Sequence, residues 1–222
     1  MKKLFSTCAA LIILFNANFT YAKPSVDDDA FWNKIAEYGN AKDEKQKEAL
    51  KKEIWDTYGV TKAIAVVDTS GFTARSIKEG ILSTLVVINE LSEIVTKDME
   101  TAHGKIIKFD ADDAFLLFDT PEDAISTLNK VKVDLEKSHI NQGDGSTITI
   151  SAGIGYGPVL LLKKDAFSQV LNITSKLGED TAGSNEILLT EDAYNALKKP
   201  IKVEAKTIKT SDIAIKYYVI TN

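Results

Sequence analysis

Cysteine and histidine are scarce in this chain of 222 residues, and their scarcity excludes several kinds of site. The chain has one cysteine, Cys8, and two histidines, His103 and His139. A single thiol cannot form an intramolecular disulfide or a cysteine-rich metal site. Two isolated histidines, neither with a ligand partner at metal spacing, indicate neither a histidine metal site nor a Ser-His-Asp hydrolase.

A basic stripe of the kind that binds nucleic acid is also missing. The formal net charge is −5, and lysines alternate with acidic residues along the chain. Proteins that bind nucleic acid concentrate Lys and Arg on one face, so we expect no nucleic-acid partner. With 44% hydrophobic and 27% charged residues, the composition is that of one ordinary globular domain.

The N-terminus contains an apolar run that is too short for a typical membrane-spanning helix. Lys2 and Lys3 precede an apolar run over residues 4–15, and Thr20-Tyr21-Ala22 gives a small-x-small sequence. A spanning helix needs about 20 apolar residues, whereas this layout is typical of a secretory signal peptide. We therefore expect a signal peptide over residues 1–22, export to the periplasm or the outside, and no stable membrane span after cleavage.

Residues 23–60 are expected to form an N-terminal helical segment. Apolar residues recur at helical spacing on both sides of a turn at Gly39-Asn40, which predicts two helices packed on the domain that follows.

Residues 61–222 alternate between strand and helix patterns. The patterns predict a strand over 62–68, a turn over 71–76 leading into a long helix over 77–103, strands over 105–110 and 114–119, and a capped helix after Thr120. A strand over 146–159, a helical turn over 169–177, a strand over 186–190, a helix over 191–199 and a closing strand over 213–221 follow. The order βαββαβ predicts an α+β ferredoxin-like sandwich with additions at its C-terminal end.

Acidic residues are concentrated at the ends of two neighbouring strands in this arrangement. Asp68 ends the first strand, and Asp112 lies in the turn of "KFDADDAFLLF" (108–118). In this topology the two carboxylates meet at one end of the sheet, beside Gly71 and a helix N-terminus. Such a group can bind Mg²⁺ while backbone N–H groups hold phosphate. We expect Asp110 and Asp113 to face solvent.

Four motifs in order resemble the catalytic domain of class III nucleotidyl cyclases. They are "AVVDTSGFT" (65–73), "HGKIIKFDADDAFLLF" (103–118), "SAGIGYGPV" (151–159) and "DAFSQVLNITSKL" (165–177). The resemblance covers about residues 61–222. It implies a fold of the class III cyclase type and a divergent, exported member of that family.

The resemblance also implies roles for individual residues, which fall on two sides of the site. On one side, Asp68 and Asp112 would bind two metal ions, Mg²⁺ or Mn²⁺, and the turn of Gly71, Phe72 and Thr73 would meet the phosphates. On the other, Lys108 and Asp165 would read adenine, Asn172 would orient the ribose, and Lys176 would act on the transition state. In that family the two sides come from different chains, so the resemblance implies a homodimer that binds ATP or another nucleotide.

Three positions depart from the family pattern. Lys176 stands where the family has Arg and lacks the forked donor geometry of a guanidinium group. Ala111 stands where a Gly usually precedes the metal-binding Asp, which is unfavourable if the turn needs a positive φ. Ser168 replaces another Gly.

The diguanylate cyclases, which share the core fold, are a second resemblance. Their Gly-Gly-Asp-Glu-Phe signature would correspond to "FDADDAF", but the glycines are absent here. The "GFT" turn and the spacing of Asp165 and Asn172 favour the class III family.

Three functions remain open from the sequence. The first is an exported adenylate cyclase that converts ATP to cyclic AMP and pyrophosphate. The second is a catalytically degenerate cyclase-fold module that binds a ligand or partner in the cell envelope. The third is a structural, dimerising sandwich whose N-terminal helices contact another envelope protein.

Overall fold

The computed structural model describes residues 29–138, 148–210 and 213–221. The expected signal peptide, residues 1–22, lies outside this part of the chain. The helices are α1 (Asp29–Gly39), α2 (Glu44–Tyr58), α3 (Phe72–Glu79), α4 (Ile81–Met99), α5 (Pro121–Lys137), α6 (Gln169–Asp180) and α7 (Glu191–Asn195). The strands are β1 (Gly59–Thr69), β2 (Gly104–Asp110), β3 (Asp113–Phe118), β4 (Ile150–Leu161), β5 (Ala166–Phe167), β6 (Ile187–Thr190), β7 (Val203–Thr210) and β8 (Ile213–Ile220).

The strands form one sheet whose centre has the ferredoxin-like order. The order is β2-β3-β1-β4-β6-β8-β7, with β5 paired to β4. Strand β1 is antiparallel to both β3 and β4, and its pairing with β4 runs from Gly59 opposite Leu160 to Thr69 opposite Ile150. The first four strands and their two helical crossovers therefore confirm the predicted βαββαβ sandwich, and β6, β8 and β7 extend it on one side.

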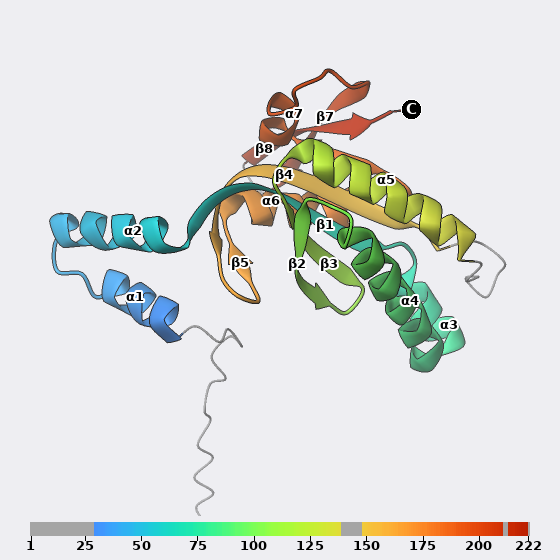
Figure 1. Cartoon of the computed structure of the whole chain (residues 1–222), viewed down its shortest axis with the longest axis horizontal. Helices are drawn as coiled ribbons and strands as arrows, with labels where there is room; N and C mark the ends of the chain where they lie inside the picture. The colour runs from blue at the N-terminus through green and yellow to red at the C-terminus, as the bar shows by residue number, and fades with distance from the viewer. Residues whose placement is uncertain (1–28, 139–147, 211–212, 222) are drawn as a thin grey trace, which may run out of the picture.

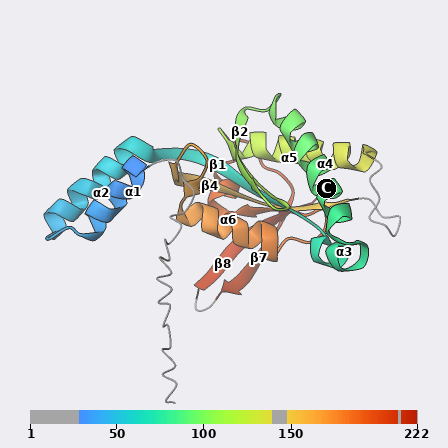
Figure 2. The ribbon, with the colours of Figure 1, turned by 90° about the horizontal axis from the view of Figure 1, so that it is seen from below.

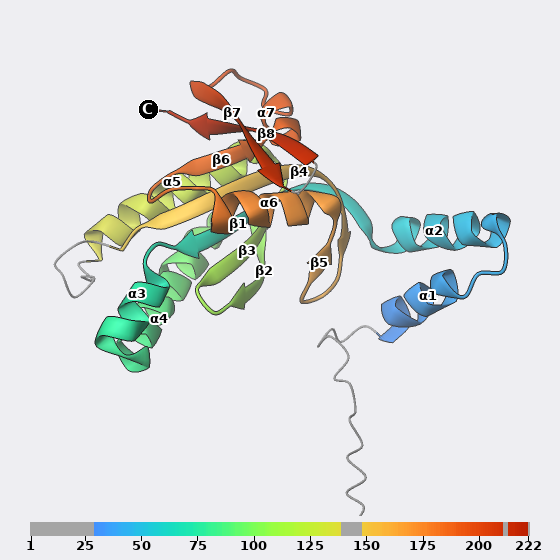
Figure 3. The same ribbon diagram turned by 180° about the vertical axis from the view of Figure 1, so that it is seen from behind.

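Helices cover both faces of the sheet (Figures 2 and 3). Alternate residues of β1 point to opposite faces: Ala63, Ala65 and Val67 join a core with α4 and α5, whereas Ile64 and Val66 belong to a second apolar cluster. This alternation is the period of a β-strand. Because both sets are fully buried, β1 is held between two layers and its C-terminal end is fixed in space.

Helix α6 lies on the face opposite to α4 and α5 and is in direct contact with the sheet backbone. A Cβ atom placed on Gly178 would lie 2.6 Å from the carbonyl oxygen of Val66, and one on Gly153 would lie 2.4 Å from that of Thr174. No side chain fits at either position, so these glycines allow the close approach of α6 to β1 and β4.

The two N-terminal helices are present as the sequence predicts, and they project from one end of the sheet (Figure 1). Phe31 of α1 and Ile54 of α2 pack against Leu162, with Trp32 and Phe167 beside them. The rings of Phe31 and Phe167 stack at 5.9 Å. These contacts attach the helical segment to the β4–β5 hairpin, while the domain boundary near residue 60 stays a prediction.

The prediction of a turn over 71–76 followed by one long helix was wrong. Helix α3 already begins at Phe72, and Gly80, with φ 85° and ψ 162°, separates it from α4. These dihedral angles are open to glycine and strained for other residues. The periodicity of the apolar residues does not reveal this break.

The turn between β2 and β3 stores backbone strain at Ala111, whose φ is 52°. We expect Ala111→Gly to stabilise the protein by about 0.5–1 kcal/mol, because the left-handed conformation costs an alanine roughly 1–2 kcal/mol and part of the gain is offset by the freer unfolded chain. Chemical denaturation measures the difference. Ala36→Gly, at an exposed position within α1, is the matched control and should destabilise by about 1 kcal/mol; a loss of stability in both variants would contradict the prediction.

Candidate functional site

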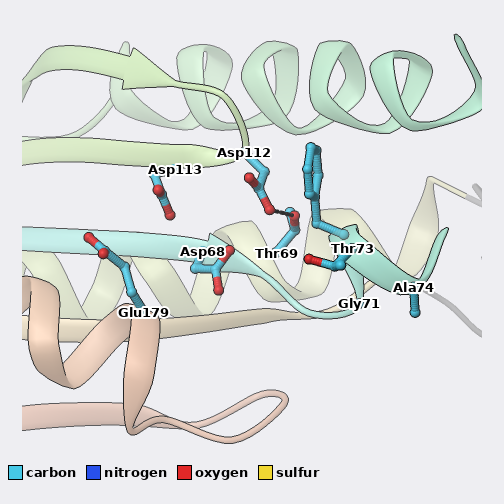
Figure 4. A pocket seen from close by; sticks show the side chains of 9 residues that line it. Asp68, Thr69, Gly71, Thr73, Ala74, Asp112, Asp113 and Glu179 are labelled. Carbon is cyan, nitrogen blue, oxygen red and sulfur yellow. Dashed lines mark hydrogen bonds between the residues drawn. The ribbon is translucent and has the colours of Figure 1, made fainter. Parts of the chain in front are cut away.

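An acidic pocket of about 470 Å³ lies where β1 ends (Figure 4). Four carboxylates line it: Asp68, Asp112, Asp113 and Glu179. The remaining lining residues are Thr69, Gly71, Phe72, Thr73 and Ala74. The lining therefore contains four acidic side chains and no basic one.

Strand β1 and the β2–β3 hairpin bring the two predicted metal ligands together. Asp68 is the penultimate residue of β1, opposite Ser151 of β4. Asp112 lies in the hairpin turn, which closes on the pair Asp110 and Asp113. The hydroxyl of Thr69 donates a hydrogen bond of 2.8 Å to Oδ2 of Asp112. This bond fixes the hairpin turn against the end of β1.

Asp113 faces the pocket, contrary to the expectation that it faces solvent. It is half-buried and lines the pocket with Asp68. Burial, together with the charges of Glu179, Asp68 and Asp112, raises its pKa to about 7. Asp110, by contrast, is exposed as expected. Asp110 and Asp113 are paired at the two ends of the hairpin turn, and the sequence alone did not determine which of them faces the pocket.

The pKa of Asp68 is also raised to about 7, from an ordinary value of 3.8, by burial and by the neighbouring charge of Asp112. Ionisation of these carboxyl groups at neutral pH is therefore opposed by desolvation and by repulsion between neighbouring negative charges. A bound cation would relieve both.

The stability of the metal-free protein should consequently fall as the pH rises from about 4 to about 7, because the folded protein then binds more protons than the unfolded chain. The two carboxyl groups Asp68 and Asp113 account for this window. We expect a lower melting temperature at about pH 8 than at about pH 5, a smaller difference in Asp113→Asn, and recovery at the higher pH on addition of Mn²⁺. Differential scanning calorimetry with and without chelator measures these changes. Equal pH dependence in the parent and in Asp113→Asn would contradict this assignment.

The N-terminus of α3 faces the same pocket. Gly71, with φ 90°, is the N-cap residue and provides no side-chain cap, and Phe72 and Thr73 follow it in the pocket lining. The first N–H groups of a helix have no acceptor within the helix and carry partial positive charge. This end of α3 can therefore hold phosphate oxygens above the carboxylates.

The two residues predicted to read the base lie next to each other. Nζ of Lys108 is 3.2 Å from Oδ1 of Asp165, and it also lies 5.0 Å from the ring centre of Phe115. Oδ1 of Asp165 also accepts a hydrogen bond of 2.9 Å from the backbone N–H of Ala166. A donor and an acceptor thus stand side by side, as the edge of adenine requires. Neither residue lines the acidic pocket.

The two predicted catalytic residues lie on α6, also outside the pocket lining. Asn172 is exposed, and Lys176 is half-buried with its Nζ 2.9 Å from Oδ2 of Asp180. The hydroxyl of Ser168 accepts a hydrogen bond of 2.8 Å from the N–H of Leu171 and so caps the helix, a role that the glycine of the family pattern could not perform. The predicted site residues therefore lie in three places within one chain: the acids with the 71–73 turn, the pair of Lys108 and Asp165, and Asn172 with Lys176 on α6.

Glu179 is a site residue that the sequence analysis missed. The sequence patterns predict a helical turn that ends at residue 177, whereas α6 continues to Asp180. A signal was available, because Glu179 continues the spacing of Asn172 and Lys176 on one helix face.

The residues present fit a divalent cation that is completed by its ligand. In the described ranges, no group of three or more His, Cys, Asp or Glu side chains is placed so that it could hold a metal ion. Asp68 and Asp112 nevertheless offer the hard oxygen donors that Mg²⁺ and Mn²⁺ prefer, and Mg²⁺ is usually held by one or two carboxylates together with phosphates and water.

The described part of the chain contains no helix with the length and apolarity needed to cross a membrane.

The fold of this chain matches solved structures of nucleotidyl cyclase catalytic domains. No protein-family model and no curated protein matches the sequence. The dimeric guanylyl cyclase domain of the RhoGC fusion protein from the aquatic fungus Blastocladiella emersonii matches with a TM-score of 0.62 and 15% identity, over 73% of this chain and 97% of that one. An adenylate/guanylate cyclase/hydrolase from Silicibacter pomeroyi matches with a TM-score of 0.60 and 17% identity, over 74% and 98% of the two chains. An adenylate cyclase from Trypanosoma brucei matches with a TM-score of 0.59 and 14% identity, over 72% and 87%. The fold of this chain is therefore that of the class III adenylate and guanylate cyclase catalytic domains.

Proposed function

We propose that this protein is a class III nucleotidyl cyclase homologue that binds ATP together with Mg²⁺ or Mn²⁺ and converts it slowly to cyclic AMP and pyrophosphate. The observation that carries the proposal is the meeting of Asp68 and Asp112 at the N-terminus of α3 in one pocket. This arrangement provides carboxylates for cations and N–H groups for phosphates at the same place.

The active form that we propose is an exported homodimer. The acids and the group of Lys108, Asp165, Asn172 and Lys176 are separate within one chain, so a second chain is needed to bring the two halves together. A C2 dimer would then contain two equivalent sites. Export rests on the signal-peptide pattern of residues 1–22.

In the proposed reaction the 3′-hydroxyl oxygen of the ribose forms a bond to the α-phosphorus and loses its proton to solvent water. The bond from that phosphorus to the bridging oxygen breaks, and pyrophosphate leaves. The cations, when bound, would lower the pKa of the hydroxyl and neutralise phosphate charge.

The side chains would bind and orient the nucleotide in this reaction. Lys108 would donate to the ring nitrogen of adenine and Asp165 would accept from its amino group. Asn172 would orient the ribose, and Lys176 would place its positive charge near the phosphates as charge develops.

Lys176→Arg should raise turnover by about tenfold if Lys176 faces the phosphates, because about 1.4 kcal/mol of added transition-state stabilisation has that effect and a forked guanidinium can supply it. The ion pair of Lys176 with Asp180 holds the ammonium group within its own helix and limits what it contributes. The rate of cyclic AMP formation under saturating ATP and Mn²⁺ measures the change. An unchanged rate in an active preparation would show that Lys176 does not face the phosphates.

A second candidate function is a cyclase-fold module that binds a nucleotide or a partner without turning it over. Glu179 favours it, since this side chain adds a negative charge to the pocket that would receive phosphates.

Calorimetric titration separates the candidates. The chain from Lys23 onward is titrated with a non-hydrolysable ATP analogue in the presence of Mn²⁺, and the same preparation is assayed for cyclic AMP with ATP. Binding with product supports the cyclase, and binding without product supports the second candidate. The absence of binding at millimolar analogue overturns both nucleotide functions and leaves the binding of a protein partner or a structural, dimerising role.

A further inference from the structure

Helix α6 carries three polar residues on one face that belong to two different places in the structure. Asn172, Lys176 and Glu179 follow one another at intervals of four and three residues, which aligns them along the helix. Asn172 and Lys176 lie outside the acidic pocket, whereas Glu179 lines it. One face of one helix therefore extends from the catalytic half of the proposed site to the metal half.

The C-terminal half of α6 is held close to the strand that carries Asp68. A Cβ atom on Gly178 would lie 2.6 Å from the carbonyl oxygen of Val66, so there is no free space between helix and strand at this point. Val66 precedes Asp68 by two residues on β1. In Figure 4 the side chain of Glu179 extends from α6 toward the carboxylates of Asp113 and Asp68. An electrostatic force on the Glu179 carboxylate therefore acts on the end of α6, which is in direct contact with β1.

We propose that Glu179 is a positioning residue that couples cation binding in the acidic pocket to the placement of Asn172 and Lys176. The inference rests on the proposed function in one respect, namely that a divalent cation binds between Asp68 and Asp112. In the proposed homodimer, Asn172 and Lys176 serve the site whose acids come from the other chain, whereas Glu179 lies beside the acids of its own chain. Each α6 therefore takes part in both sites, and cation binding at one site affects the other.

The physical basis is a change in the sign of the force on Glu179. Without a cation, its carboxylate faces those of Asp68 and Asp113 and is repelled, which loosens the last turns of α6. A divalent cation in the pocket attracts the same carboxylate and so holds the helix end in its contact with β1. Because α6 is then ordered before the nucleotide binds, nucleotide binding costs less conformational entropy.

Hydrogen–deuterium exchange of the full chain with Mn²⁺ and no nucleotide tests the coupling. We expect Mn²⁺ to slow exchange of the amides in 169–180 by about tenfold or more, as a local opening that becomes harder predicts. Glu179→Gln should abolish this slowing, and Glu179→Asp should restore part of it. Glu136→Gln, an identical chemical change at an exposed position of α5, is the control and should behave as the parent. Mn²⁺-dependent slowing that is the same in Glu179→Gln and in the parent would overturn the proposal.

A second measurement separates positioning from a merely structural role. In the absence of metal, Glu179→Gln should melt no lower than the parent, since it removes a repelled charge. With nucleotide analogue present, it should need a higher Mn²⁺ concentration for half-maximal binding and should lose cooperativity in Mn²⁺. A lower melting temperature with an unchanged Mn²⁺ midpoint would overturn the positioning role.

The two proposals fail in distinguishable ways. Nucleotide binding without any effect of Mn²⁺ on exchange of 169–180 overturns the coupling and leaves the proposed function intact. Slowed exchange that depends on Glu179, without nucleotide binding at any Mn²⁺ concentration, supports the coupling and overturns the proposed function.

Discussion

Replacing Asp68 or Asp112 with alanine should abolish cation-dependent nucleotide binding. Each substitution removes one of the two carboxylates that the pocket offers to the cation, beside the N-terminus of α3. Loss of a residue that only supports a metal ligand already weakens binding by about 10–100-fold, so loss of the ligand itself should exceed about a hundredfold. Calorimetry with Mn²⁺ and a non-hydrolysable ATP analogue measures the loss.

The electrostatics of the pocket allow this loss to be distinguished from unfolding. Because the pKa of Asp68 is raised to about 7 by burial and by Asp112, removal of Asp68 should not lower the stability of the metal-free protein at neutral pH. Asp110→Ala is the matched control, since Asp110 is on the same hairpin but is exposed and outside the pocket lining. Nucleotide and Mn²⁺ binding by Asp68→Ala and Asp112→Ala at the level of the control would show that the site lies elsewhere.

Two inactive variants should restore function to each other when they are refolded together. In a dimer of Asp112→Ala with Asn172→Ala, one site combines an intact Asp112 with an intact Asn172, and the other site lacks both. Random pairing of equal amounts makes half of the dimers mixed, and each has one working site of two, so about a quarter of the parent activity should return for a C2 dimer with shared sites. The rate of cyclic AMP formation, or the stoichiometry of analogue binding with Mn²⁺, measures the recovery.

The pair Asp68→Ala and Asp112→Ala is the control for this experiment. Both substitutions lie in the metal half, so every site of the mixed dimer lacks one acid and no activity should return. If the first pair also stayed inactive while sedimentation showed mixed dimers, the two halves would not be shared between chains.

The centre of the fold could be predicted from the sequence because local and non-local requirements agree there. The buried run of β1, the tight turn of the β2–β3 hairpin and the capped helix α5 each have one strong local signal. The structure matches that prediction in its strand order as well. Strand β7 was missed, because it is an edge strand with mostly exposed residues and an ordinary polar sequence. The end of α3 was missed because only the dihedral angles of Gly80 reveal it.

The sequence predicts which strand ends carry the acidic site residues, but not the direction in which each side chain points. Asp68 and Asp112 meet as the topology requires, whereas the orientation of Asp113 depends on the register of a two-residue turn. Glu179 could not be predicted for another reason: it lines the pocket only because α6, which follows β1 much later in the chain, approaches β1 at Gly178. Contacts of this kind depend on tertiary packing, which no local pattern encodes.

The glycines beneath α6 have a consequence for how far sequences with this fold can diverge. At Gly153 and Gly178 backbone meets backbone, so no other residue can be accepted without displacing the helix. The acids of the pocket, in contrast, repel one another, and loss of Asp112 would remove from the fold one hydrogen bond with Thr69. A lineage that abandoned the chemistry would thus be expected to lose Asp68 and Asp112 first and to keep these glycines. At identities near the 15% seen with the fungal domain, glycine spacing should therefore trace ancestry further than the acidic motif.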